Sequence, residues 1–210
     1  MATDSNWFDD WLKRRLHRDI IFRILVWSSI ASATAYFASR ETGFSGIGYL
    51  ANASKSLLPV LNLIGSAAIM LSLVAMMFKD AEHVGGVKWS KSSSLGRFGG
   101  IVRRLAGDLT LWVVGSLVAL LSAVTVVLVQ AVNIGAMTSR NASAIAVMYF
   151  VFGIFLIVTA ILNVYVRRAK PPLTASIPFS LFLHTPWRVV PVYVLAIGFI
   201  AYRVWLTRQG

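Results

Sequence analysis

The chain has 210 residues, of which 57% are hydrophobic and 13% are charged, and its formal net charge is +12 at neutral pH. Soluble domains carry about 25% charged residues, so this composition, with a mean hydropathy of +0.72, excludes an ordinary soluble protein and indicates a membrane protein. Because the chain contains no cysteine, disulfide bonds, thiolate metal sites and cysteine nucleophiles are also excluded.

The first segment, residues 1–19, has the pattern of an amphipathic helix that lies on a membrane surface. Its bulky apolar residues recur at spacings of three and four and so share one helical stripe; they are Trp7, Phe8, Trp11, Leu12 and Leu16. Such a helix binds anionic headgroups through its charges and the interface through its aromatic rings. We therefore expect Trp7, Trp11, Arg14 and Arg15 to contact lipid headgroups or a partner subunit.

Five segments are long and apolar enough to cross a bilayer, because a helix needs roughly 20 mainly apolar residues to cover about 30 Å of hydrocarbon. They are residues 20–38, 57–78, 111–132, 144–166 and 189–206. The first and the last carry Arg23 and Arg203, but an arginine near a helix end can extend to the headgroups. The sequence thus predicts an all-α membrane protein, a polytopic bundle of five transmembrane helices over residues 20–206. A four-span alternative stays open if residues 189–206 do not insert.

The connections between these spans are short. The longest runs from Lys79 to Asp108, and a chain below about 40 residues rarely forms its own core, so no separate soluble domain is expected. Residues 171–186 are semi-apolar and interrupted by prolines, and we expect an interfacial or re-entrant segment there. Pro59 is expected one turn into its span, where a proline costs little. None of the eight acidic residues falls in an expected span, which disfavours a proton- or cation-coupled pump.

Basic residues alternate between dense and sparse connections, with 15 on one side of the predicted membrane and 5 on the other. By the positive-inside rule the N-terminus is cytoplasmic and, with five spans, the C-terminus lies outside. Anionic phospholipids are the expected partners of the dense side, where each Lys or Arg contributes about 1 kcal/mol of attraction. The arginines expected to contact headgroups there are Arg103, Arg104, Arg167 and Arg168. Because topology explains the net charge, no nucleic acid is expected. The absence of cysteine favours a bacterial inner membrane over other membranes.

Small residues spaced four apart mark faces along which membrane helices can approach closely. Such residues are Gly115, Ala119 and Ala123 in the third span, and Ser28 and Ser32 in the first. Lipid is as apolar as leucine, so close van der Waals contact is what holds spans together. We expect these faces to pack within the chain or against another subunit.

Catalytic and metal-binding signals are weak. His17, His83 and His184 are spread over three connections without the spacing of a metal motif, so we expect no metal, no cofactor and no enzyme activity. An enzyme acting on lipid headgroups through His83 or His184 would need a carboxylate partner, and the nearby candidates are few. They are Asp80, Glu82 and Asp108.

The sequence therefore favours a non-catalytic integral membrane subunit that packs with partners and positions them in a larger complex. The alternative is a small channel, pore or transporter for anions or uncharged solutes, formed by one chain or a homo-oligomer. Its polar lining would come from Ser116, Ser122, Thr125, Gln130 and Asn163.

Overall fold

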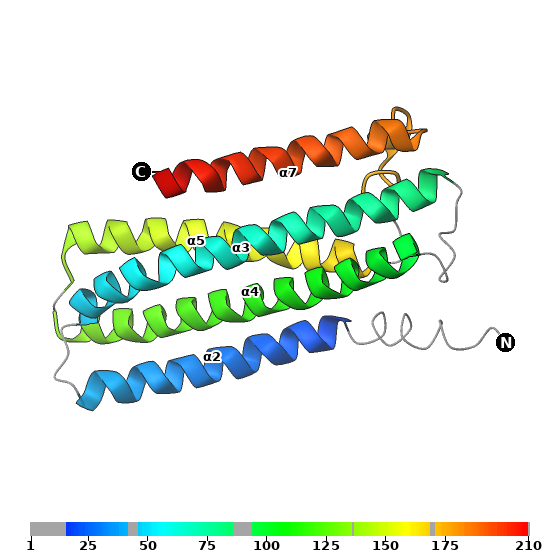
Figure 1. Ribbon diagram of the computed structural model, residues 1–210. Helices are drawn as coiled ribbons and strands as arrows, with labels where there is room; N and C mark the ends of the chain where they lie inside the picture. The colour runs from blue at the N-terminus through cyan, green and yellow to red at the C-terminus, as the bar shows by residue number, and fades with distance from the viewer. Residues whose placement is uncertain (1–15, 42–45, 86–93, 136, 169–170, 210) are drawn as a thin grey trace. The chain divides into compact units, whose positions relative to one another are not determined.

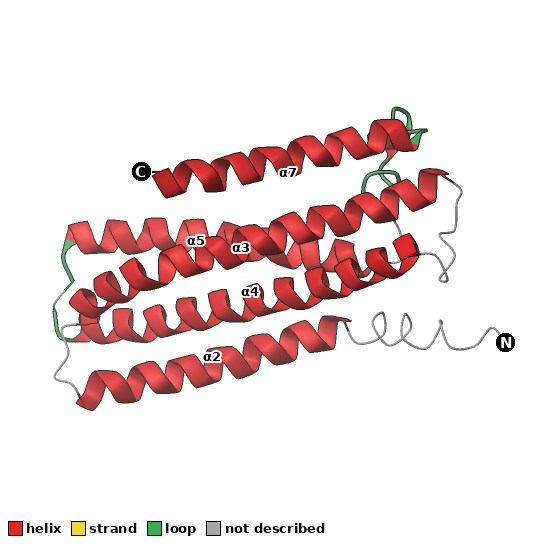
Figure 2. Cartoon of the chain, in the orientation of Figure 1, coloured by secondary structure: helices red, strands yellow, loops and turns green. Residues whose placement is uncertain are grey.

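The computed structural model describes residues 16–41, 46–85, 94–135, 137–168 and 171–209. Most of the expected surface helix, residues 1–19, lies outside these ranges, as do Trp7, Trp11, Arg14 and Arg15. No strand occurs in the described ranges, and helices make up nearly all of them (Figure 2). The helices are α2 (Leu16–Glu41), α3 (Gly46–Gly85), α4 (Ser94–Asn133), α5 (Ser139–Arg167), α6 (Ile177–Ser180) and α7 (Pro186–Gln209) (Figure 1).

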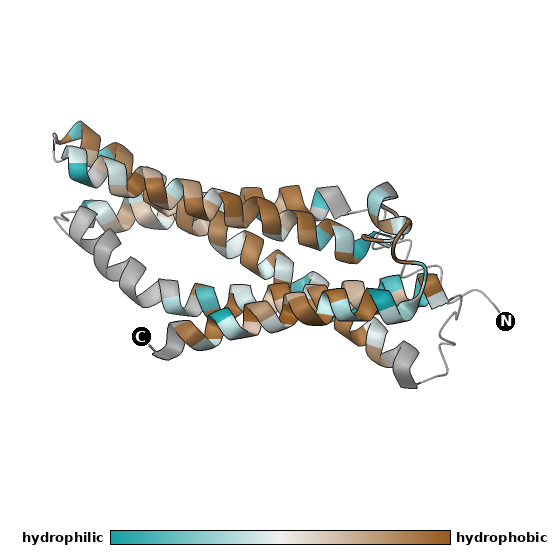
Figure 3. Cartoon of the chain, turned by 90° about the horizontal axis from the view of Figure 1, so that it is seen from above, coloured by the Kyte–Doolittle hydropathy of each residue, from teal (hydrophilic) through white to brown (hydrophobic). Residues whose placement is uncertain are grey.

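Five of these helices are long and apolar enough to cross a membrane, which confirms the predicted fold class. Their apolar segments are Ile20–Arg40, Leu61–Val84, Phe98–Asn133, Ala142–Arg167 and Pro186–Leu206. Each of the five expected spans lies within one of the helices. Figure 3 shows apolar residues along the lengths of these helices, with hydrophilic residues toward several of their ends. The long uncharged runs therefore predict the number and type of the elements correctly.

The ends of α3 and α4 differ from the sequence-based expectation. Each helix has 40 residues, which at 1.5 Å per residue gives about 60 Å, twice the thickness of the hydrocarbon layer. The expected connection from Lys79 to Asp108 is therefore mainly helical, because α3 continues to Gly85 and α4 begins at Ser94. Charged residues end an apolar run, but Lys, Arg and Glu are good helix formers and do not end a helix.

These helix ends also bear on two other expectations. The apolar segments Leu61–Val84 and Phe98–Asn133 are longer than the expected spans, and the added ends contain Asp80, Glu82 and Asp108. Pro59 lies in the interior of α3 and not in its first turn. Proline removes one backbone hydrogen bond, a loss that membrane helices tolerate when other groups satisfy the carbonyl.

The chain divides into two compact units, and each of the long helices α3, α4 and α5 contributes to both. The first unit contains residues 63–110 and 161–210. Its core consists of buried residues from α3, α4, α5, α7 and the connection before α7. These residues are Ala75, Met76, Val102, Ala106, Val166, Leu183, Val189 and Tyr193. Alanines at α3 and α4 leave little side chain between the backbones, as close helix packing requires.

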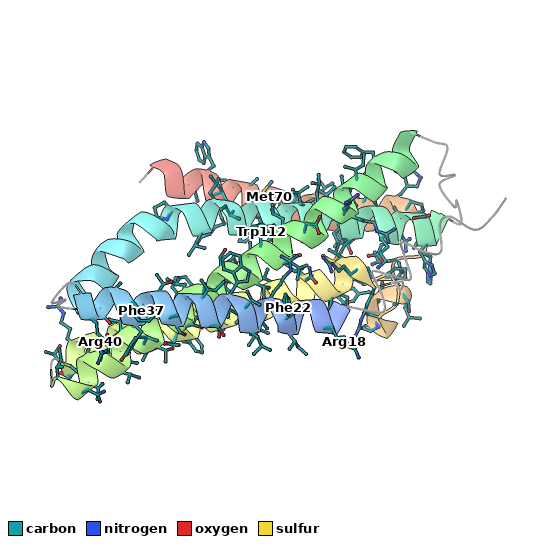
Figure 4. The ribbon with its side chains drawn as sticks, turned by 90° about the horizontal axis from the view of Figure 1, so that it is seen from below. Arg18, Phe22, Phe37, Arg40, Met70 and Trp112 are labelled. Carbon is teal, nitrogen blue, oxygen red and sulfur yellow. The ribbon has the colours of Figure 1, made fainter. Side chains whose placement is uncertain are left out.

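The second unit contains residues 17–62 and 111–160. Within it, Trp27 of α2 packs against α4, where its ring centroid lies 6.0 Å from that of Trp112. Arg18 and Arg40 mark the two ends of α2 and bracket Phe22 and Phe37, all drawn in Figure 4. Both phenylalanines are exposed. Apolar side chains between terminal arginines are the pattern of a span whose charges reach the two interfaces.

Candidate functional site

One group of polar residues in the first unit surrounds Asp80, near the end of α3. Its side chain is fully buried, and its carboxylate accepts four hydrogen bonds. The Oδ1 atom accepts from the Thr174 hydroxyl at 2.8 Å and from the Thr174 amide at 3.1 Å. The Oδ2 atom accepts from the Leu173 amide at 3.3 Å and from the Tyr193 hydroxyl. We call Asp80, Leu173, Thr174 and Tyr193 the Asp80 network.

The Asp80 network joins three parts of the chain. Asp80 belongs to α3, Leu173 and Thr174 to the connection after α5, and Tyr193 to α7. Figure 1 shows this connection beside the end of α3. The four donors named above all belong to the chain, and hydrogen bonds of this kind stabilise a buried carboxylate. The arrangement is that of a structural carboxylate that fixes the connection and α7 on α3.

Lys79, the neighbour of Asp80, is also buried, and its ammonium group donates hydrogen bonds to backbone carbonyls at the end of α5. Its Nζ atom donates to the carbonyl of Tyr165 at 3.2 Å and to the carbonyl of Arg168. The last carbonyls of a helix have no partners within the helix, and a cation there is favoured by the helix dipole. Lys79 therefore satisfies the end of α5, while Asp80 holds the segment that follows it.

A second polar contact in the same unit joins α4 to α5. The buried amide of Asn163 donates through Nδ2 to the Gly107 carbonyl and to the Thr110 hydroxyl, both at 2.8 Å. Thr110 in turn donates to the carbonyls of its own helix. A Cβ at Gly107 would lie only 3.2 Å from Nε of Arg167, whose guanidinium is 3.6 Å from a carboxylate oxygen of Asp108. Gly107 thus lets the arginine lie across α4.

In the second unit α2 contacts α4 closely at Gly115. A Cβ there would lie 3.0 Å from two atoms of the Trp27 ring, so the absence of a side chain is what lets α2 approach α4. Thr125 of α4 bonds Tyr149 of α5 at 2.5 Å, and the Tyr149 hydroxyl also donates to the Leu121 carbonyl at 3.1 Å. These contacts hold α2 and α5 on α4.

The residues expected to pack or to line a pore fall in different surroundings. Gly115 is buried, whereas Ser28, Ser32, Ala119 and Ala123 are half-buried. Among the expected pore residues, Thr125 and Asn163 bond within the chain as described. The remaining three are half-buried; they are Ser116, Ser122 and Gln130.

The expected headgroup contacts differ among themselves in exposure. Arg104 and Arg168 are exposed, whereas Arg103 and Arg167 are half-buried. The Arg168 guanidinium lies 6.0 Å from the centroid of the Tyr165 ring, and Arg167 lies beside Asp108.

Sequence reasoning did not find the Asp80 network. It treated Asp80 only as a carboxylate partner for His83 or His184, but both histidines are exposed, and the oxygens of Asp80 are occupied by other donors. The available signal was the adjacent Lys79 and Asp80 at the end of an uncharged run. Topology alone explains a lysine there, but a carboxylate directly after an apolar run calls for a partner of its own.

The described residues contain no group of three His, Asp or Glu side chains that could hold a metal ion. No family model matches the chain, and comparison with curated proteins and with solved structures gives no match.

Proposed function

We propose that the chain is a non-catalytic subunit that positions partners in a larger membrane assembly. The observation that supports the proposal most directly is the low burial of α2 within the chain. No residue in the most apolar part of this helix is fully buried by the chain, yet the helix has small residues on two faces. Ser28 and Ser32 are half-buried, while Ser29 and Ala33 are exposed and four residues apart. Small residues at this spacing permit close approach of a further helix.

The polar groups of the chain support the same proposal. Catalytic carboxylates need an open side toward substrate, but Asp80 is buried and its oxygens accept from the chain's own donors. The Lys79 ammonium group donates hydrogen bonds to the backbone carbonyls of Tyr165 and Arg168. These groups stabilise the protein's own helices, as is expected of a scaffold.

The pore alternative gains less from the structure. Thr125 and Asn163, two of its five lining candidates, are held by bonds between helices. A polar side chain that bonds a neighbouring helix contributes about 0.6 kcal/mol to packing, which accounts for both residues without a channel. We keep solute flux through reconstituted vesicles as the test of this alternative.

In the proposed orientation the basic ends of the helices face the cytoplasm of a bacterial cell, the N-terminus is cytoplasmic and the C-terminus is outside. Exposed arginines such as Arg104 and Arg168 would then meet anionic headgroups. Reporter fusions at Asn52, Lys91 and Gly210 test this orientation. A reporter at Lys91 on the same side as one at Asn52 would refute it.

The partner proposal is tested by purification from the native membrane in mild detergent, with two matched variants. Ala33→Leu places a bulky side chain on the outward face of α2, and Ala146→Leu makes the same change at an exposed alanine of α5. We expect specific proteins, or a second copy of the chain, to co-purify with the unaltered protein and with Ala146→Leu, and to be lost from Ala33→Leu. A lone chain in all three preparations would refute the subunit proposal.

A further inference from the structure

The connection between α5 and α7 carries large apolar side chains on its outside. Phe179 is exposed to 49%, Leu181 to 65% and Phe182 to 70%, and Trp187, at the start of α7, is exposed to 88%. In the spans, exposed apolar residues are explained by the surrounding lipid, but Phe179, Leu181 and Phe182 precede the last apolar segment, which begins at Pro186. Several exposed apolar side chains that are close together in the chain and lie outside the spans indicate an interaction surface.

The chain connectivity limits where this surface can be. The apolar segment of α5 ends at Arg167 and that of α7 begins at Pro186, and the connection between them has only a four-residue helix, α6. It cannot cross the bilayer, which needs about 20 helical residues. The end of α5 and the start of α7 therefore lie at one membrane surface, and the connection lies at the same surface.

The inner side of the connection is fixed to the first unit. Leu183 is part of the buried core, and Leu173 is packed against that core. The Asp80 network holds the amides of Leu173 and Thr174. The connection is thus amphipathic, with Leu173 and Leu183 toward the core and Phe179 and Phe182 away from it.

Backbone groups of this connection form hydrogen bonds within the protein, as a position with little water requires. The amides of Phe179 and Ser180 donate to the Ser176 carbonyl, and those of Phe182 and Leu183 donate to the Phe179 carbonyl. The Arg188 guanidinium donates to the Phe182 carbonyl at 3.3 Å. Backbone groups that leave water must find such partners within the protein.

The charges that flank the surface have one sign. Arg168 precedes it and Arg188 follows it, both exposed, and no acidic residue occurs from Arg168 to Arg188. Basic residues beside an apolar, aromatic surface are the chemistry that binds an anionic lipid interface, and Trp187 lies at the edge of a span, where tryptophan prefers to be.

We propose that residues 177–187 are an interfacial anchor that enters one leaflet at the boundary between headgroups and acyl chains. Phe179, Leu181, Phe182 and Trp187 contact the lipid, and Arg168 and Arg188 contact anionic headgroups. The anchor would exist whether or not the chain has protein partners, so it is independent of the proposed subunit function.

The absence of cysteine permits a direct test with single nitroxide labels in the full-length protein. The label is placed at Phe182→Cys, with Leu195→Cys, exposed on α7, as the deep reference and Ser139→Cys, exposed before the α5 span, as the aqueous reference. Collision rates with oxygen and with a water-soluble nickel chelate are measured in phosphatidylcholine vesicles with and without phosphatidylglycerol. We expect the label at residue 182 at an intermediate depth, about 5–10 Å into the interface.

Two results would overturn the anchor. A label at residue 182 that meets the nickel chelate as often as the label at Ser139 would place the surface in water. A label that meets neither reagent would mean that protein, in this case a second copy, covers it. The charge component is tested with Arg188→Gln. We expect phosphatidylglycerol to slow the motion of the label at residue 182, and Arg188→Gln to reduce that response; an equal response in both proteins would refute the role of this arginine.

Discussion

The bond between Tyr193 and Asp80 can be removed with little other change by Tyr193→Phe. The ring of Tyr193 is buried in the core of the first unit, and phenylalanine keeps that ring. What is lost is one hydroxyl that donates to Oδ2 of Asp80, which then keeps only the Leu173 amide at 3.3 Å. The variant therefore isolates one hydrogen bond to a carboxylate.

The size of the decrease in the free energy of unfolding distinguishes an average hydrogen bond between membrane helices from a hydrogen bond to a charged group. A hydrogen bond between membrane helices averages about 0.6 kcal/mol, whereas a bond to a charged group contributes about 1.5–3 kcal/mol. At about 1.4 kcal/mol for each factor of ten, the second range corresponds to an unfolding equilibrium constant raised about 10- to 150-fold. We expect the larger effect, because Asp80 is fully buried and water cannot replace the lost donor.

The assay is equilibrium unfolding by SDS in mixed micelles, followed by tryptophan fluorescence. Tyr202→Phe is the matched control, since Tyr202 is on the same helix but exposed and stacks on Trp205 through its ring. We expect Tyr202→Phe to unfold as the unaltered protein does. If Tyr193→Phe lowers the free energy of unfolding by no more than the control does, the Asp80 network is not what holds α7.

Three other changes test the remaining contacts. Lys79→Met removes the donor to the last carbonyls of α5 and should speed amide hydrogen exchange in that turn, with unchanged exchange there counting against its capping role. Gly115→Leu must displace Trp27 and should lower the SDS midpoint, whereas Gly153→Leu, where a Cβ meets nothing within 4 Å, should not; equal midpoints would contradict the contact. Thr125→Val removes an exposed hydroxyl that bonds Tyr149 and the Leu121 carbonyl of its own helix, and it should cost less than about 1 kcal/mol in the same unfolding assay.

The number of long helices followed from the sequence because the cost of a charge in hydrocarbon is large and local. Uncharged runs such as residues 111–132 and 144–166 could therefore be assigned without knowledge of their neighbours. Helix ends follow a different rule. A helix continues past its apolar part as long as the residues favour it, and so α4 begins at Ser94, well before its first expected membrane residue.

The polar site could not be predicted, because its residues are distant along the chain. Asp80 bonds Thr174 and Tyr193, which are 94 and 113 positions away. No periodicity in a single helix contains that information. The spacing of Gly115, Ala119 and Ala123 similarly indicates a face suited to close packing, but it does not say that Trp27 is what lies against Gly115.

Apolar contacts alone give a membrane helix little reason to choose a protein neighbour, since lipid offers equivalent contacts. This matters most for α7, because only 11% of its most apolar part is buried within the chain. A hydrogen bond to a carboxylate has no equivalent in hydrocarbon, so the Tyr193 bond to Asp80 distinguishes α3 from lipid as a neighbour of α7. The same carboxylate holds Leu173 and Thr174. One buried carboxylate thus fixes both α7 and the part of the connection that leads into the proposed interfacial anchor, and loss of the carboxylate in Asp80→Leu should release the two together.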